Sequence, residues 1–281
     1  MFKIKKYIPD IVVAIILIAG IGLLAYPTIG DYINALHSSK AIGSYVEKTK
    51  DLSKEEKENL LREAREYNES LVGKVNRYYL NEEEKKRYAH ILDITKTGIM
   101  AYVEIPKLNI YMPVYHGTDE GVLQIAAGHL PGSSLPVGGE NTHSLISGHR
   151  GLPSAKLFTD IDKLKKGDLF FIHVFDEVLA YKVNQIKIVL PDDVETLEIE
   201  KGKDYVTLIT CTPYGVNSHR LLVRGERTVY KQSESKIEDM IKKNNLKYIM
   251  LTAGVILALI GMTVLVSVFL IKRRKRRKLN E

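Results

Sequence analysis

Two long apolar runs near the ends of the chain stand apart from a more polar middle. Residues 11–26 read IVVAIILIAGIGLLAY and are followed by Pro27, and residues 248–271 contain no charged side chain. A helix needs about 20 apolar residues to cross the roughly 30 Å hydrocarbon core of a membrane. The pattern therefore predicts membrane-spanning helices at residues 11–29 and 248–271. A cleaved signal peptide has the same design as the first segment, but no small-x-small cleavage site directly follows Tyr26.

Basic residues flank both apolar runs on the side away from the middle of the chain. Three lysines lie within residues 1–10, and residues 272–278 read KRRKRRK. Because basic residues mark the cytoplasmic end of a span, residues 1–10 and 272–281 are predicted to be cytoplasmic and the middle extracytoplasmic. The chain is thus expected to be a multi-pass protein of the cell membrane. The basic tail accounts for the net charge of +7, so the near-neutral remainder argues against a nucleic-acid-binding surface.

Residues 30–97 have a polar, helical pattern. Ser53 and Glu56 form the S-x-x-E signature of a capping box. Apolar side chains then recur at helical spacing, at Leu60, Ala64, Tyr67 and Leu71. This pattern predicts one or two amphipathic helices that pack on the following domain; a solvated spacer is the alternative.

Residues 98–230 change to short runs with strand character, followed by a polar linker at residues 231–247. The runs are IMAYVEI, NIYMPVY, HSLISGH, DLFFIHVF, VLAYKVNQIKIVL, DYVTLITC and RLLVRGE. Each is bounded by Pro, Gly, Asp or Asn, which favours a mainly β fold, either a closed barrel or a sandwich. A short helix or turn is expected at residues 156–166.

The only cysteine of the chain lies where one of these strands ends. Cys211 follows the β-branched and aromatic run 205–210, and Pro213 and Gly215 then predict a turn before Arg220 opens the next strand. A single cysteine cannot form an intramolecular disulfide, so an accessible thiol is a candidate nucleophile. A small buried hydrophobe is the alternative role for a lone cysteine.

A nucleophilic cysteine needs a base or a cation that holds it as thiolate. His149 is the candidate base, because Gly148-His149-Arg150-Gly151 leaves the predicted strand 144–147 in a turn. A metal site with His143, His149 and Cys211 is disfavoured because neither HExxH nor CxxC occurs. We therefore expect no metal and no cofactor.

Other histidines and arginines compete for roles in the site. His116, His129 and His219 lie in loop-like contexts, and a supporting place in the site wall is conceivable for His129. Arg150 and Arg224 compete with Arg220, and Arg224 shares the face of Arg220 by strand parity.

These motifs resemble those of the sortases. TLITC at residues 207–211 matches the sortase TLxTC signature, Gly148-His149 matches the catalytic histidine, and the active-site arginine falls on Arg220. The wider phrases IPKLNIYMPVYHGT, GHLPGSSLPVGGENTHSLISGHRGLPSAKLF and TCTPYGVNSHRLLVRGER look like class C, the pilin-polymerising sortases. The resemblance implies an eight-stranded closed β-barrel with peripheral helices, which the two membrane helices would flank.

The resemblance also implies an activity, that of a cysteine transpeptidase. Cys211 would attack the Thr-Gly bond of an LPxTG-like sorting signal, His149 would act as general acid and base, and Arg220 would stabilise the oxyanion or the substrate. The acceptor would be a lysine amine of another pilin subunit. A housekeeping-type sortase that anchors proteins to the cell wall and a non-catalytic assembly or binding factor are the alternatives.

Class C sortases often carry a lid with an Asp-Pro-aromatic motif over the site. The corresponding stretch here reads VNRYYLNEEEKKRYAHIL and lacks that motif. Either Tyr78 and Tyr79 cover the site in another way, or the site is open.

Overall fold

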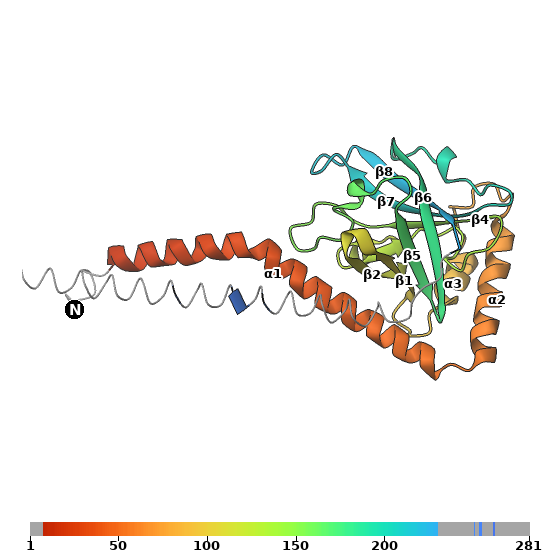
Figure 1. The fold of residues 1–281 in the computed structure, drawn as a ribbon, viewed down its shortest axis with the longest axis horizontal. Helices are drawn as coiled ribbons and strands as arrows, with labels where there is room; N and C mark the ends of the chain where they lie inside the picture. The colour runs from red at the N-terminus through yellow and green to blue at the C-terminus, as the bar shows by residue number, and fades with distance from the viewer. Residues whose placement is uncertain (1–7, 230–249, 251–252, 255–260, 262–281) are drawn as a thin grey trace, which may run out of the picture. The chain divides into compact units, whose positions relative to one another are not determined.

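The computed structural model describes residues 8–229, 250, 253–254 and 261 (Figure 1). It divides into two compact units, Pro27–Tyr230 on the one hand and Met1–Tyr26 with Lys231–Glu281 on the other. The predicted linker 231–247 and tail 272–281 fall outside the described residues. The predicted second membrane helix, 248–271, has only four described residues, so it stays a prediction.

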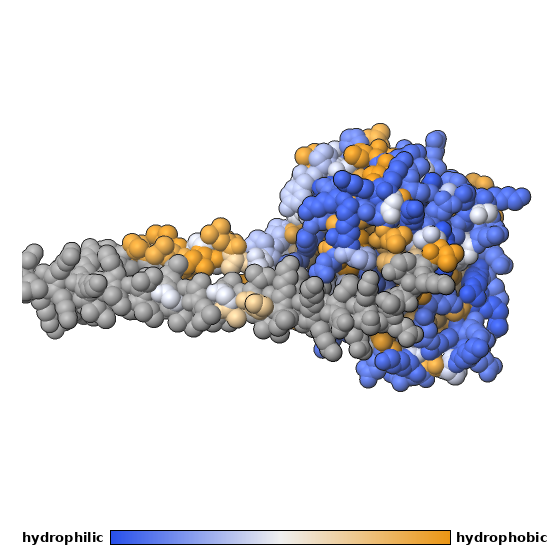
Figure 2. All heavy atoms as spheres, in the orientation of Figure 1, coloured by the Kyte–Doolittle hydropathy of each residue, from blue (hydrophilic) through white to orange (hydrophobic). Residues whose placement is uncertain are grey.

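The first helix is longer than the sequence pattern suggests. α1 runs unbroken from Ile8 to Asp51, so Pro27 lies inside the helix and does not end it. Side chains of its N-terminal part, such as Leu23 and Leu24, are apolar and exposed (Figure 2). Within the described part of the chain, α1 is the one helix long and apolar enough to cross a membrane. Proline removes one backbone hydrogen bond, and here the helix continues despite that loss.

Two further helices begin at capping boxes. α2 spans Lys54–Leu71, and Ser53 and Glu56 exchange the two predicted cap hydrogen bonds at 3.2 and 2.7 Å. α3 spans Glu82–His90 and begins in the same way at Asn81. The side chains that α2 buries lie on one face, as an amphipathic helix on a domain surface requires; they are Leu61, Ala64, Tyr67, Asn68 and Leu71.

The middle of the chain forms a closed barrel, which excludes the sandwich. The strands are β1 (Ile99–Ile105), β2 (Ile110–His116), β3 (Ala127–His129), β4 (Thr142–Ser147), β5 (Leu169–Val174), β6 (Glu177–Val189), β7 (Asp204–Thr212) and β8 (His219–Arg227). Their order around the barrel is β1-β2-β3-β4-β7-β8-β6-β5. The connections contain α4 (Glu120–Leu123) and the 3-10 turns η2 (Pro106–Leu108), η3 (Ile161–Lys163) and η4 (Glu195–Leu197). The stretch 156–166, where a short helix or turn was expected, contains a turn at residues 157–160 followed by η3.

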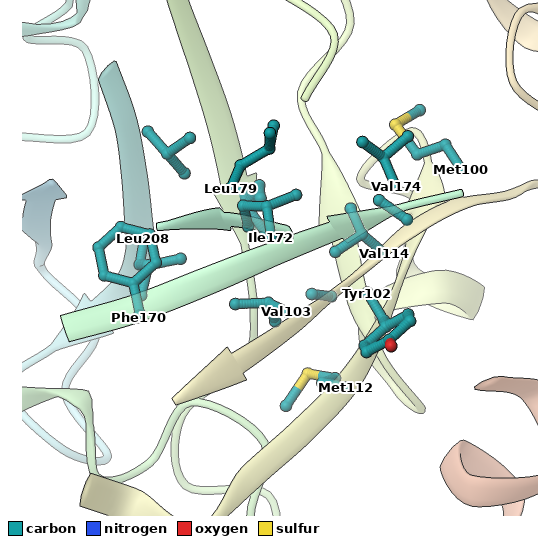
Figure 3. Packing of buried hydrophobic residues seen from close by; sticks show 14 of the residues in the cluster. Met100, Tyr102, Val103, Met112, Val114, Phe170, Ile172, Val174, Leu179 and Leu208 are labelled. Atoms are coloured by element: carbon teal, nitrogen blue, oxygen red, sulfur yellow. The ribbon is translucent and has the colours of Figure 1, made fainter. Parts of the chain in front are cut away.

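The barrel interior is filled by aliphatic and aromatic side chains from every side (Figure 3). Val103, Val114, Ile172 and Leu208 are all fully buried there. A close approach requires glycine on β8, since a Cβ at Gly225 would lie 2.5 Å from the Phe170 ring. The alternating strand pattern thus directs one set of residues into the barrel and leaves the other set on its outer face.

Helix α1 is joined to the barrel near its C-terminal end by a buried tyrosine. The hydroxyl of Tyr45 donates to Met100 O and accepts from Phe175 N, both at 3.0 Å. The Tyr45 and Phe175 rings stack with centroids 6.3 Å apart. These contacts make the C-terminal half of α1 part of the barrel unit.

Candidate active site

Three neighbouring strands bring the predicted catalytic residues to one edge of the barrel. β4 pairs with β7 in parallel, with Ser147 opposite Ile209, and β7 pairs with β8 so that Cys211 is opposite Arg220. Gly148 N donates to Ile209 O at 3.0 Å, so the β4 register continues past the strand. Carried two residues beyond the end of β4, that register would bring His149 alongside Cys211. The nucleophile candidate therefore lies on the middle strand, with the histidine on one side and the arginine on the other.

These side chains share the outer face of the barrel. Side chains alternate between the two faces of a strand, so Cys211 lies on the face of Ile209, and Arg220 on that of Leu222. Ile209 and Leu222 belong to a small apolar cluster outside the main core, together with Leu145 and Leu197. Cys211 is a free thiol of intermediate exposure. An apolar floor thus adjoins a partly exposed thiol.

The β7–β8 loop holds Arg220 at the mouth of the site. Nη1 of Arg220 donates to Asn217 O at 3.1 Å and to His219 O at 3.2 Å. Cross-strand partners have Cβ atoms about 5 Å apart, so the guanidinium can reach a group bound at Cys211. A guanidinium stays charged at any ordinary pH and can stabilise negative charge without a proton transfer.

The loop after β4 is built tightly around His149. Phe158 N donates to His149 O at 3.1 Å, and Thr210 Oγ1 donates to Gly148 O at 2.7 Å. A Cβ at Gly148 would lie 2.5 Å from the Phe158 ring, so only glycine fits before the histidine. The backbone of His149 is therefore held both by its own loop and by β7.

Arg150, a competitor of Arg220 by sequence, fastens this loop. Its Nη1 donates to Thr212 Oγ1 at 3.3 Å, and its Nη2 forms an ion pair with Asp162. Thr212 directly follows Cys211, so Arg150 ties the histidine loop to the end of the nucleophile strand. Its guanidinium is engaged with Asp162 and Thr212, which makes Arg220 the better placed cation.

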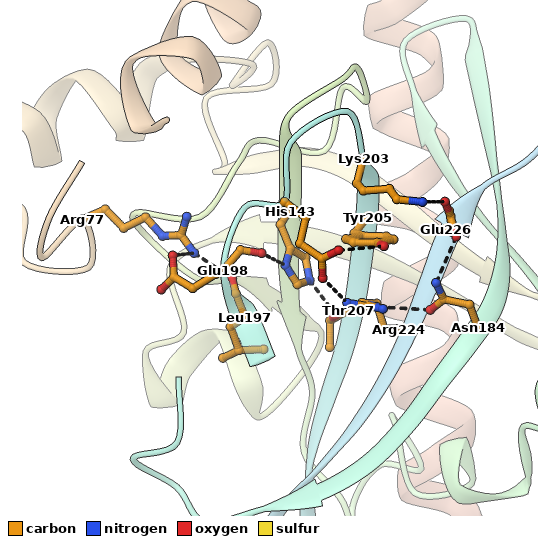
Figure 4. Close-up of polar contacts among 11 residues, drawn as sticks. Arg77, His143, Asn184, Leu197, Glu198, Lys203, Tyr205, Thr207, Arg224 and Glu226 are labelled. Atoms are coloured by element: carbon orange, nitrogen blue, oxygen red, sulfur yellow. Dashed lines mark hydrogen bonds and ion pairs between the residues drawn. The ribbon is translucent and has the colours of Figure 1, made fainter. Parts of the chain in front are cut away.

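Arg224, the other competitor, lies away from the thiol. It pairs across the sheet with Thr207, four residues from Cys211 along β7, which corresponds to about 13 Å. Its Nη1 donates to Glu200 at 2.9 Å, and its guanidinium lies 4.0 Å from the centre of the Tyr205 ring (Figure 4). Strand parity predicted the shared face correctly, but the side chain belongs to a separate polar network.

Two other histidines, His143 and His129, are buried and have both ring nitrogens engaged. His143 contacts Glu198 O at 2.8 Å and Thr207 Oγ1 at 2.7 Å (Figure 4), and burial lowers its pKa to about 4. Six residues of β4 and its extension separate it from His149, about 20 Å. Among the described residues no group of three or more His, Cys, Asp or Glu side chains could hold a metal ion.

His129 is not the loop or surface residue that its sequence context suggested. It ends β3, is fully buried, and its Nδ1 lies 3.0 Å from the Tyr88 hydroxyl. Its Nε2 lies 2.8 Å from Ser134 O, and burial lowers its pKa to about 3. A neutral histidine in this place joins α3 to the barrel through the Tyr88 hydroxyl. His116 and His219 likewise lie at the ends of β2 and β8.

The stretch before α3 covers the apolar floor beside Cys211. Tyr78 packs against the cluster of Leu145, Leu197, Ile209 and Leu222, whereas the Tyr79 side chain is 84% exposed. Of the two tyrosines singled out by sequence, Tyr78 therefore lies over the site face.

Buried Arg77 connects this stretch to the β6–β7 loop (Figure 4). Its Nη2 donates to the Tyr78 hydroxyl and to Leu197 O, both at 2.7 Å, and lies 3.6 Å from a Glu198 carboxylate oxygen. A Cβ at Gly132 would lie 2.2 Å from Arg77 O, so the stretch also touches the β3–β4 connection. The sequence held one signal of this role, an arginine directly before an aromatic pair.

Comparison with known proteins identifies relatives of this chain. Residues 103–228 match a family model described as "Sortase domain". The chain is 49% identical to the crystal structure of sortase C1 from Streptococcus agalactiae, with a TM-score of 0.67, covering 68% of this chain and 100% of that one. It is 47% identical to the structure of Streptococcus pneumoniae sortase C, with a TM-score of 0.62, covering 69% of this chain and 99% of that one.

Curated relatives are more distant. Sortase A of Streptococcus agalactiae is 28% identical over 53% of this chain, and sortase A of Bacillus anthracis is 31% identical over 47%. In both cases the chain spans 61% of the length of the relative.

Proposed function

The chain belongs to the sortase family, whose members are cysteine transpeptidases, and within it to class C; from this premise we propose that it joins pilin subunits covalently. Cys211 would cleave the Thr-Gly bond of an LPxTG-like sorting signal and transfer the acyl group to a lysine amine of another pilin. The structure of Streptococcus pneumoniae sortase C provides insights into pilin substrate specificity, and that relative supports the same substrate class here.

One observation carries the proposal, namely the strand register at the barrel edge. Cys211 is paired with Arg220 on β8, and the β4 register continued through Gly148 leads to His149 beside it. A nucleophile and a charge stabiliser on two paired strands, with a general acid–base in the loop after the third, would form the arrangement that acyl transfer needs. A rigid barrel edge keeps these groups in place while leaving the thiol accessible.

In the first half-reaction Cys211 Sγ, as thiolate, attacks the carbonyl carbon of the threonine. The carbonyl oxygen becomes an oxyanion, which the Arg220 guanidinium stabilises by charge and hydrogen bonding. His149 gives its proton to the glycine nitrogen as the carbon–nitrogen bond breaks. The products are a thioester on Cys211 and a free glycine amine.

In the second half-reaction an acceptor amine replaces the thiol. His149 takes the proton of the attacking lysine amine, and a second oxyanion forms at the same carbon. When the carbon–sulfur bond breaks, Cys211 leaves as thiolate and an isopeptide bond remains. Protons and charge balance over the two steps, with no cofactor required by the chemistry.

We also propose that the stretch around Tyr78 is a lid. Tyr78 lies on the apolar cluster that adjoins Cys211 along the same strand face, where a bound peptide would have to lie. Arg77 joins it to Leu197 and Glu198 of the β6–β7 loop. A substrate would displace the Tyr78 ring from the apolar floor.

Membrane attachment at the N-terminus fits this function. The exposed apolar part of α1 is long enough to span a membrane. We propose that α1 anchors the enzyme and that the barrel lies on the extracytoplasmic face, where sorting signals and pilin lysines are available. The segment 248–271 would provide the second span.

Intact-mass spectrometry of the full chain in detergent tests the reaction. The chain is mixed with an LPxTG-type peptide, with Cys211→Ala in parallel, and an acyl adduct on the wild type alone is expected. Adding a lysine-bearing pilin should convert the adduct into an isopeptide-linked product. If only water released the acyl group from Cys211, transfer to pilin would be refuted. If a cell-wall peptide amine accepted the acyl group, the housekeeping type of sortase would be favoured. No adduct from either the wild type or a Tyr78→Ala variant would favour a binding or assembly factor.

A further inference from the structure

We propose that Gly30 and Asp31 of α1 position the loop that carries His149, so that the anchor helix supports the active site directly. This inference rests on the proposed function, because it assigns His149 the proton transfers described above. Asp31 comes five residues after Tyr26, where the apolar sequence run ends.

Helix α1 contacts the backbone of the histidine loop at two successive residues. Asp31 Oδ1 accepts a hydrogen bond from Lys156 N at 2.9 Å. At the preceding residue, a Cβ on Gly30 would lie 2.8 Å from Ser154 O and 2.9 Å from Ser154 Cα. Real Cβ atoms do not approach backbone atoms that closely, so this contact requires glycine. Two successive helix residues therefore contact the same loop, one by its carboxylate and one by having no side chain.

A short chain of hydrogen bonds leads from this contact to the histidine. Lys156 O accepts from Thr159 N at 2.8 Å, which closes a turn over residues 156–159. Within that turn, Phe158 N donates to His149 O at 3.1 Å. The Phe158 ring is fully buried and lies against Gly148. A shift of the Lys156 backbone would thus reach His149 through two rigid contacts.

The turn contains a backbone conformation that needs outside support. Leu157, between Lys156 and Phe158, has φ of 39°, in the left-handed region that branched side chains rarely adopt. Such a residue keeps this conformation only where surrounding contacts hold it. The Asp31 hydrogen bond to the neighbouring amide is one such contact, and the buried side chain of Leu157 is another.

Asp31 and Arg150 fasten opposite ends of the loop. Arg150 joins the loop start to Thr212 beside the nucleophile, whereas Asp31 joins the far end to α1. Without the Asp31 side chain, the start of the loop would keep its Arg150–Thr212 hydrogen bond to β7, but the turn at residues 156–159 would lose its hydrogen bond to α1. His149 would then sample positions from which proton transfer is slow, while the peptide-binding floor of Leu145, Ile209 and Leu222 would be unchanged.

The effect should therefore appear in kcat and not in KM. Displacing a catalytic group by about 1 Å can cost on the order of 100-fold in rate, and a loosened loop misplaces it for part of the time. We expect Asp31→Ala to lower kcat of peptide-to-lysine transfer about tenfold with KM nearly unchanged. Asp31→Asn should stay near wild type, because its amide oxygen can accept the same hydrogen bond.

The matched control lies on the same helix. Asp51 is an exposed carboxylate whose ion-pair partner among the described residues is Lys48, at 3.6 Å on the helix surface. Asp51→Ala removes the same side chain from α1 without touching the loop, and it should leave kcat and KM unchanged. All variants are measured as full-length protein in detergent micelles, and the thermal unfolding midpoint of each is recorded.

The outcomes separate this inference from the proposed function. Inactivity of both the wild type and Tyr78→Ala, or an active Cys211→Ala, would refute the proposed function itself. An active wild type with Asp31→Ala equally active would overturn only the role of Asp31. Equal losses in Asp31→Asn and Asp31→Ala would also overturn it, since the hydrogen bond would not be the cause. A fall in kcat in Asp31→Ala alone, with an unchanged unfolding midpoint, would support positioning.

Discussion

Removing the Tyr78 side chain should open the site and speed the formation of the acyl-enzyme. Tyr78 is half-buried against the apolar cluster of Leu145, Leu197, Ile209 and Leu222. In Tyr78→Ala the ring is lost, and the floor beside Cys211 becomes available to a peptide without competition. The expected result is a faster reaction from a substitution that removes a large aromatic residue.

The size of the effect follows from the buried ring. A fully buried tyrosine covers roughly 150–250 Å², so a half-buried ring covers about 100 Å². At about 25 cal/mol per Å² this burial contributes about 2.5 kcal/mol to the closed state. Such a loss lowers the ratio of closed to open protein by up to about 60-fold. The rate constant for adduct formation should therefore rise between about tenfold and 60-fold.

Two matched variants separate the ring from other effects. Tyr79→Ala removes the neighbouring tyrosine, which is 84% exposed, and should leave the rate unchanged. Tyr78→Phe keeps the ring and removes the hydroxyl that accepts from Arg77 at 2.7 Å. The hydroxyl also donates to Leu197 O, but at 3.4 Å, so the loss is mainly that of the Arg77 hydrogen bond. Because one hydrogen bond contributes about 1 kcal/mol net, the rate should rise about fivefold.

The assay is rapid-quench intact-mass spectrometry of the full chain with an LPxTG-type peptide at concentrations below KM. The alkylation rate of Cys211 by iodoacetamide is measured in parallel, since it reports thiol access without peptide binding. A folded Tyr78→Ala variant with wild-type rates in both measurements would refute the lid. A faster alkylation with unchanged peptide reaction would show that Tyr78 shields the thiol without competing for the peptide site.

Two further predictions follow from the charges around the site. Arg220→Ala should lower kcat/KM for acyl transfer by about 100- to 1,000-fold, because the oxyanion loses its charged partner. In Arg224→Ala kcat/KM should stay within about twofold of wild type, since Arg224 pairs with Glu200 and Asn184 away from the thiol. Equal losses of kcat/KM in the two variants, measured in steady-state assays, would contradict the assignment of Arg220. Burial lowers the pKa of His129 from 6.5 to about 3 and that of His143 from 6.5 to about 4. Below pH 6.5 the unfolded chain therefore binds more protons than the folded protein. The free energy of unfolding should fall as the pH is lowered from 6.5 to 4, by up to about 1.4 kcal/mol per pH unit for each histidine. Urea unfolding at pH 7 and pH 5 measures this slope, and a pH-independent midpoint would show that these histidines are not buried as neutral groups.

Local patterns in the sequence predicted most of the elements and the chemistry-bearing residues. The Ser53–Glu56 capping box begins α2 where predicted, and the seven strand runs of residues 98–230 became seven of the eight strands of the barrel, whereas β3 (Ala127–His129) matched none of them. Strand alternation predicted that Arg224 shares the face of Arg220. These features depend on residues within a few positions of one another. They can be read from the sequence because side chains repeat every 2.0 residues on one face of a strand and every 3.6 residues on one face of a helix.

Contacts between distant residues were decided only by the fold. Whether the strands close into a barrel depends on the pairing of β1 with β5, about 70 residues apart. Tyr78 and Tyr79 look alike in sequence, yet one lies on the apolar floor and the other in solvent. The sequence predicted a membrane helix over residues 11–29, but α1 continues without a break to Asp51.

By itself, then, the sequence determined most of the strands and helices, and which of their residues carry a thiol, an imidazole or a guanidinium at a strand end. Only the tertiary structure decided that β4 lies beside β7 and β7 beside β8, that Tyr78 covers the floor, and that Asp31 reaches the histidine loop. The physical reason is that periodicity encodes which face a side chain takes. Which residues from distant parts of the chain contact that side chain depends on the packing and hydrogen bonding of the whole chain.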